Sequence, residues 1–121
     1  MPAWDGIDRR RFVRVKVYFK TNVSEKEKFS ISSFAEELSQ SGIRISIKRE
    51  LDVFSLVDLE IFLREEPIVC QGKVIWVKKV EGEHIEGGVI FDVGLKLRKI
   101  SVEDRLLIKT FVAQKKKEKK I

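Results

Sequence analysis

The feature that most constrains the fold of this chain is a series of short segments in which apolar and polar residues alternate. A repeat of two residues is typical of a β-strand with one buried face, because successive side chains point to opposite sides. The segments with this pattern cover residues 11–20, 29–34, 43–47, 57–63, 68–80 and 84–91. Short strands joined by brief connections predict a mainly β domain, a small six-stranded antiparallel barrel.

Three places in or between these segments carry their own expectations. The polar residues 21–27 are expected to form a loop. Gly72 interrupts the longest strand, and we expect a bend or a β-bulge there. Trp76 alternates with Val74, so the sequence predicts that its ring packs in the core.

The character of the chain changes at Ser101. Ser101–Asp104 resembles a capping box, although aspartate replaces the usual glutamate or glutamine. Apolar residues then recur at helical spacing, at Val102, Leu106, Ile108, Phe111 and Val112. Lysines follow, where the helix dipole favours cations. The sequence therefore predicts one C-terminal helix that packs on the barrel.

The net charge of +6 is concentrated at two places. Residues 115–120 hold five lysines and one glutamate, and four arginines lie within residues 9–14. We interpret the lysines as a solvated helix end, and a contact with a membrane surface or nucleic acid is the less favoured alternative.

The length of 121 residues predicts one domain. We expect a flexible lead over residues 1–8, the domain over residues 9–114 and a lysine-rich tail over residues 115–121. No apolar run is long enough to predict a transmembrane segment.

Several chemistries are not expected. Cys70 is the only cysteine and His84 the only histidine, so neither an intrachain disulfide nor an ordinary Cys/His zinc site can form. Cys70 lies in a predicted strand, where we expect a buried and unreactive thiol. No glycine-rich phosphate loop or nucleophile elbow is present. We therefore expect no enzyme, no catalytic residue, no metal site and no cofactor, and a cytoplasmic location.

Two short motifs are candidates for ligand binding. The first is Arg9-Arg10-x-x-x-Arg14, in which guanidinium groups can fold around a small anion, because arginine binds phosphate in a bidentate manner and stacks on rings. The second contains Glu37, Ser39 and Gly42 and connects two predicted strands. Carboxylate, hydroxyl and glycine at this spacing can form a small polar cup.

Together, in this order and spacing, the two motifs resemble those of the PilZ family, bacterial receptors for cyclic di-GMP (c-di-GMP). The family carries Arg-Arg-x-x-x-Arg before or on its first strand, and Asp/Asn-x-Ser-x-x-Gly some twenty-odd residues later. Gly72–Trp76, Gly88–Phe91 and the terminal helix are also similar, so the resemblance extends over about residues 7–113. It implies a PilZ-type barrel with a C-terminal helix.

The resemblance also implies site residues. Arg10 and Arg14 contact phosphate and the Hoogsteen edge of guanine, and Arg9 stacks or adds a phosphate contact. Ser39 and the acidic residue of the second motif hold a guanine edge, next to Gly42. That acidic residue is Glu37 here, one methylene longer than the family's aspartate, so we expect weaker binding. Stacking of Trp76 on guanine is the alternative to core packing.

Three functions remain open at this point. The first is a c-di-GMP receptor whose N-terminal segment closes on the ligand and signals through an unidentified partner protein, as a monomer or a ligand-dependent dimer. The second is a PilZ adaptor that has lost ligand binding through Glu37. The third, a basic barrel for single-stranded nucleic acid, is least favoured because most aromatic residues are expected in the core.

Overall fold

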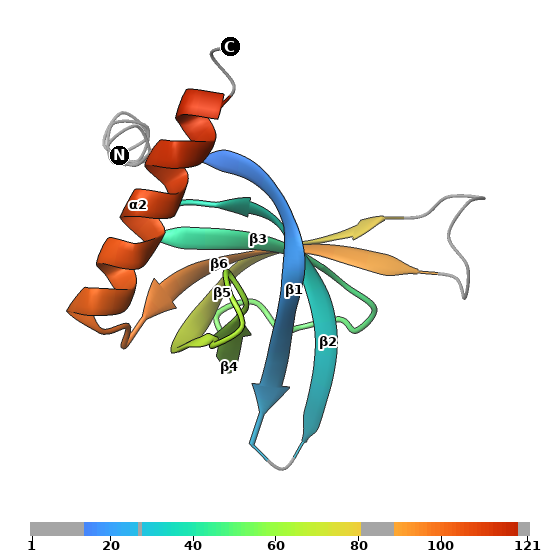
Figure 1. Ribbon diagram of the computed structural model, residues 1–121. Coiled ribbons are helices and arrows are strands. Elements are labelled where there is room, and N and C mark those ends of the chain that lie inside the picture. The colour runs from blue at the N-terminus through green and yellow to red at the C-terminus, as the bar shows by residue number, and fades with distance from the viewer. Residues whose placement is uncertain (1–13, 27, 81–88, 119–121) are drawn as a thin grey trace, which may run out of the picture.

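The computed structural model describes residues 14–26, 28–80 and 89–118 of the chain. The described residues form six strands and one helix: β1 Val15–Glu25, β2 Phe29–Leu38, β3 Gly42–Ile47, β4 Leu56–Ile61, β5 Ile68–Val80, β6 Ile90–Arg98 and α2 Val102–Glu118. All neighbouring strands are antiparallel and close into a barrel in the order β1-β2-β3-β6-β5-β4 (Figure 1). The predicted antiparallel barrel with a C-terminal helix is confirmed.

Closure of the barrel depends on the long first strand. β1 pairs with β2 along its length and, through Thr21–Ser24, also pairs with β4. Every strand therefore has two neighbours, which removes the unpaired edges of an open sheet. The inward side chains of alternating positions fill the interior, including Val23, Ile45, Leu59 and Val93, which are fully buried.

Helix α2 lies across one end of the barrel (Figure 1). Ile108 and Val112 are buried against the barrel, and the Phe111 ring meets Phe19 edge-on with 6.1 Å between centroids. The cap predicted at Ser101 is present, because its Oγ accepts a hydrogen bond of 3.1 Å from the backbone N–H of Asp104.

Part of the predicted apolar face of this helix is wrong. Val102 and Leu106 point outward and are 81% and 58% exposed, whereas Ile108 is fully buried. The buried face is made by residues 107, 108, 111 and 112, because the side of the helix that carries Val102 and Leu106 is turned away from the barrel. The helix also continues past residue 114, so Lys115–Lys117 belong to its last turn.

The predicted loop over residues 21–27 is also wrong, because β1 continues to Glu25. Thr21 is fully buried, and its hydroxyl lies 2.6 Å from the Ser33 hydroxyl of β2. Thr21 and Ser33 thus satisfy each other inside the barrel, which allows β1 to continue through a polar sequence.

The last strand extends further than predicted. Residues 84–88 and His84 lie outside the described residues, and β6 runs from Ile90 to Arg98, well beyond Phe91. Val93, Leu95 and Leu97 alternate inward along this strand and are buried.

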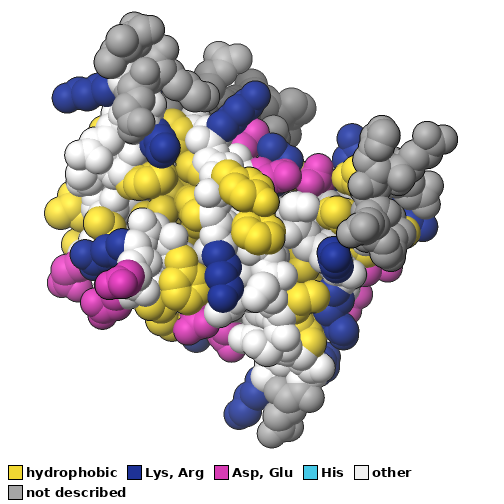
Figure 2. Space-filling view, turned by 45° about the vertical axis from the view of Figure 1, so that its right-hand side comes forward, with side chains coloured by type: hydrophobic (Ala, Val, Ile, Leu, Met, Phe, Trp, Pro, Cys, Tyr) yellow, Lys and Arg dark blue, Asp and Glu magenta, His cyan; other side chains and the backbone are white. Residues whose placement is uncertain are grey.

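Aromatic residues lie nearer the surface than the sequence suggested. Tyr18, Phe34, Phe54 and Trp76 are exposed, and the other aromatic residues that the structure describes are only partly buried. On the face of the molecule that Figure 2 shows, apolar side chains reach the surface in separate patches, with charged groups between them. No helix in the described part of the chain is long and apolar enough to cross a membrane.

The buried position predicted for Cys70 is confirmed, because this residue is only 6% exposed. Burial raises the pKa of the Cys70 thiol to about 11, and the Asp104 carboxylate adds to this effect while Arg105 opposes it. The thiol is therefore a weak nucleophile at neutral pH.

Truncation of the helix face that packs on the barrel should lower stability. We expect Ile108→Ala to reduce the free energy of unfolding by about 2–4 kcal/mol, because it leaves a cavity under α2. Urea denaturation measures this change. The matched control is Leu106→Ala on the exposed face, which should stay within about 0.5 kcal/mol of the wild type. Equal losses in the two variants would contradict this orientation of the helix.

Candidate ligand-binding site

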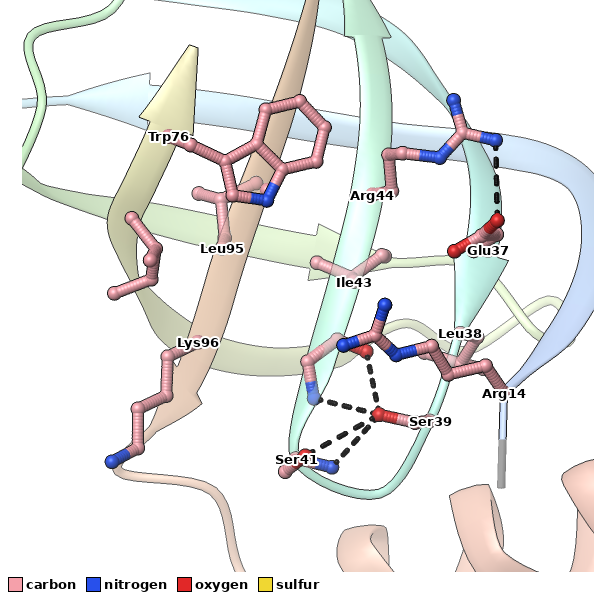
Figure 3. A pocket seen from close by; sticks show the side chains of 13 residues that line it. Arg14, Glu37, Leu38, Ser39, Ser41, Ile43, Arg44, Trp76, Leu95 and Lys96 are labelled. Atoms are coloured by element: carbon pink, nitrogen blue, oxygen red, sulfur yellow. Dashed lines mark hydrogen bonds and ion pairs between the residues drawn. The ribbon is translucent and has the colours of Figure 1, made fainter. Parts of the chain in front are cut away.

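A hollow of about 350 Å³ lies where the β2–β3 turn meets β5 and β6 (Figure 3). Four residues of the two sequence motifs line it: Arg14, Glu37, Ser39 and Gly42. Arg9 and Arg10 lie outside the described residues, so their predicted places remain predictions. The first motif is thus represented by one arginine, and the second motif by all three of its residues.

The β2–β3 turn is organised by the Ser39 side chain, which is only 4% exposed. Its Oγ accepts hydrogen bonds from the backbone N–H groups of Ser41, at 3.3 Å, and Gly42, at 3.1 Å. The Ser39 N–H in turn donates to the Gly42 carbonyl at 2.9 Å. Ser39 therefore shapes the wall of the hollow through the backbone of the turn.

Gly42 is required by the close approach of two strands. A Cβ at this position would lie 2.9 Å from the carbonyl oxygen of Leu95 on β6, and a backbone atom cannot move aside as a flexible side chain can. The φ of Gly42 lies outside the left-handed region, so the close approach of β6 and not the backbone conformation requires glycine here.

Arg14 supplies positive charge to the hollow. It immediately precedes β1, its side chain is exposed, and its guanidinium points into the hollow above Ser39 (Figure 3). It takes part in no ion pair with another described residue, and a guanidinium at this place is suited to bind an anionic ligand.

Glu37 is bound by a residue that the sequence analysis did not single out. Arg44 on β3 lies opposite Glu37 in the register of β2 and β3, and its Nη2 is 3.4 Å from Glu37 Oε2. Figure 3 shows the two side chains on the same wall of the hollow. The signal was present in the sequence, because opposite charges that flank a tight hairpin turn tend to meet across the strands.

Arg44 also binds two further carboxylates behind this wall. Its Nη1 lies 2.6 Å from Glu36 Oε2 and 3.5 Å from Asp92 Oδ2. Burial raises the pKa of the Glu36 carboxyl, and the charge of Asp92 and a hydrogen bond with it act in the same direction, while Arg44 partly offsets the rise. The cluster of Glu36, Glu37, Arg44 and Asp92 therefore places excess negative charge beside the hollow.

The core position predicted for Trp76 is wrong. Trp76 is 41% exposed and lines the hollow opposite Arg44 (Figure 3). A β-bulge between Val74 and Trp76 shifts the alternation, so Ile75 and Trp76 both point outward. The pairing at Gly72 is regular, so the bulge lies after the position where it was expected.

The indole of Trp76 lies directly over Gly94 of β6. A Cβ at Gly94 would overlap the ring, so glycine makes room for it. The hollow thus combines a cationic side chain, a carboxylate and the face of an aromatic ring. This combination suits a ligand that has both a phosphate group and a planar base.

The comparison with protein families decides where this barrel belongs. The PilZ domain matches residues 8–114, nearly the whole chain. The chain belongs to the PilZ domain family. Among the described residues of this PilZ domain, no group of His, Cys, Asp and Glu side chains is placed to hold a metal ion.

Several solved structures share the fold. The chain is similar to the inhibitor of motility MotI/DgrA of Bacillus subtilis, with a TM-score of 0.73 and 18% identity over 92% of this chain and 52% of that chain. It is similar to the PilZ domain of Escherichia coli YcgR with c-di-GMP, with a TM-score of 0.71 and 13% identity over 91% and 93% of the two chains.

A third similar structure is the MrkH–c-di-GMP complex of K. pneumonia, with a TM-score of 0.68 and 15% identity over 93% of this chain and 54% of that chain. This chain thus spans about half the length of the MotI/DgrA and MrkH chains. Comparison with curated proteins gives no match.

The place of Trp76 can be tested through Gly94. We expect Gly94→Ala, made in a Trp4→Phe background, to push the indole into solvent and to shift its fluorescence emission to longer wavelength, because the new methyl group overlaps the ring. The control is Gly72→Ala, whose Cβ is nearest to the Leu59 and Leu95 side chains rather than to the indole and should leave the emission unchanged. An unchanged spectrum in Gly94→Ala would contradict the placement of the ring.

Proposed function

We propose that this chain is a c-di-GMP receptor that binds its ligand in the hollow beside the β2–β3 turn. The observation that carries the proposal is the convergence of Arg14 with Glu37, Ser39 and Gly42 on one hollow, although Arg14 belongs to the first motif and lies more than twenty positions before the second. Membership of the PilZ family supports it, and so do the bound ligands named for the YcgR and MrkH structures.

The chemistry of the ligand fits the charge of the hollow. C-di-GMP has two phosphates and two guanines, and arginine is the usual partner of both phosphate and the guanine O6/N7 edge. Arg14 supplies one guanidinium from the edge of the hollow, and we propose that Arg10 and Arg9 supply others. A hydrogen bond to a charged group contributes about 1.5–3 kcal/mol, so a few such bonds account for much of a micromolar affinity.

The opposite walls provide base recognition. Trp76 presents a ring face, and stacking of a base on such a face contributes about 1–3 kcal/mol. The Glu37 carboxylate accepts hydrogen bonds from the N–H groups of guanine once Arg44 releases it. Ser39 and Gly42 contribute by fixing the turn, since the Ser39 hydroxyl is already hydrogen-bonded within it.

The output is proposed to pass through a partner protein. Ligand binding changes the conformation of the N-terminal segment that carries Arg9 and Arg10, and this change is what the partner detects. The receptor has no catalytic step, acts in the cytoplasm, and is a monomer or a ligand-dependent dimer.

The second candidate is a PilZ adaptor that does not bind the nucleotide. The observation that favours it is the Arg44–Glu37 ion pair together with Glu36 and Asp92, which place three carboxylates around one guanidinium beside the hollow. Excess negative charge there opposes a ligand with two phosphates.

Calorimetric titration with c-di-GMP distinguishes the two candidates. We expect the wild type to bind, and Arg14→Ala and Arg10→Ala each to weaken binding by about tenfold to a hundredfold, because each removes charge-assisted hydrogen bonds. Arg64→Ala is the control, since this exposed arginine does not line the hollow and its loss changes net charge equally. No heat from the wild type at high micromolar ligand would exclude the receptor and leave the adaptor.

A second titration tests the acidic residue of the motif. We expect Glu37→Asp to tighten c-di-GMP binding severalfold, because the shorter side chain withdraws from Arg44 and its carboxylate is free to accept from guanine. The matched control is Glu65→Asp, an exposed position outside the lining of this hollow, which should change affinity little. Equal affinities of Glu37→Asp and the wild type would show that Glu37 does not limit binding.

A further inference from the structure

The β2–β3 turn is bound by a residue from the other end of the chain. Arg105 of α2 donates a hydrogen bond from Nη1 to the backbone carbonyl of Gln40 over 3.1 Å, although 65 positions separate the two residues. Among the described residues, this is the one side-chain hydrogen bond that joins α2 to the barrel. It joins the helix to the centre of the motif that lines the hollow.

The bond completes a set of restraints on this turn. Inside the turn, the Ser39 hydroxyl accepts from the N–H groups of Ser41 and Gly42. On the side of β6, the Leu97 N–H donates to the Ser41 carbonyl at 2.9 Å. On the side of α2, Arg105 satisfies the Gln40 carbonyl.

Arg105 is itself held in place. Its backbone N–H donates to the Ser101 carbonyl at 2.9 Å in the capped first turn of α2, and its side chain is half-buried. Ile108, less than one turn further on, is buried against the barrel. A displacement of the turn therefore has to break the Arg105–Gln40 bond or move the start of the helix with it.

We infer that Arg105 is a positioning residue for the hollow, and that it couples ligand occupancy to the docking of the first turns of α2. This inference rests on the proposed function for its ligand. A ligand that holds the Ser39–Gly42 turn in this geometry stabilises the docked helix through Arg105, and a docked helix favours the ligand to the same degree, because coupling between two sites is reciprocal.

Cys70 provides a reporter for this coupling. It is buried inside the barrel near the start of α2, since the charges of both Asp104 and Arg105 reach its thiol. A reagent reaches such a thiol only when the covering structure opens, so the rate of its modification by a disulfide reagent follows the opening of this end of the barrel.

The test compares Arg105→Met, Arg105→Lys and the wild type. The control is Lys109→Met, which removes the same charge from an exposed position of the same helix. Amide hydrogen exchange at Ser41 and Gly42 is measured in ligand-free protein. The affinity for c-di-GMP is measured by calorimetry, and the rate of Cys70 modification is measured with and without c-di-GMP. Melting by circular dichroism checks that each variant is folded.

In Arg105→Met we expect exchange at Ser41 and Gly42 to become about tenfold faster and c-di-GMP affinity to fall about tenfold, in keeping with the loss of a hydrogen bond from a charged donor. In Arg105→Lys, the changes in exchange rate and in c-di-GMP affinity should be smaller than in Arg105→Met. Lys109→Met should change neither the exchange rate nor the affinity. C-di-GMP should slow Cys70 modification in the wild type and have less effect in Arg105→Met.

Unchanged exchange at Ser41 and Gly42 in Arg105→Met would overturn the positioning role, whether or not a ligand binds. Faster exchange with unchanged c-di-GMP affinity, or ligand protection of Cys70 that persists in Arg105→Met, would overturn the coupling. If the wild type does not bind c-di-GMP, the proposed function fails and the coupling fails with it, while the exchange measurement still decides the positioning role.

Discussion

The hollow depends above all on the hydrogen bonds that hold the β2–β3 turn. The Ser39 hydroxyl binds the turn from within, and β6 and α2 bind it from outside through Leu97 and Arg105. Because buried polar backbone groups need partners, each of these bonds also satisfies a group that the tight turn would otherwise leave unpaired. The turn is thus the place where the hairpin, the closing strands and the terminal helix meet.

Barrel closure then determines what faces the turn. β3 pairs with β6 and β6 with β5, so Gly42, Gly94 and Trp76 come together from three separate segments. The two glycines act in different ways, since Gly42 admits the backbone of β6 and Gly94 admits the indole ring. On the other wall, Arg44 binds Glu37, so the residue that departs from the family pattern has an internal partner before any ligand arrives.

Much of the architecture could be predicted because alternation is a local signal. It located most strands, and the serine cap located the start of the helix. Prediction from alternation failed where contacts between strands override the local pattern. Thr21 is polar but is satisfied by Ser33 across the hairpin, and Trp76 follows an alternating run but is turned outward by a bulge. The sequence of a single strand shows neither which residue lies opposite in the neighbouring strand nor where a bulge inserts an extra residue.

The sequence by itself determined the strand and helix types, the two motifs and their order, because these depend on residues close together in the chain. The convergence of Arg14 with the second motif, the outward turn of Trp76 and the Arg44 and Arg105 contacts were decided only by the tertiary structure. Each of these contacts joins residues whose distance depends on strand register and helix docking. Those quantities follow from packing of the whole barrel rather than from any local pattern.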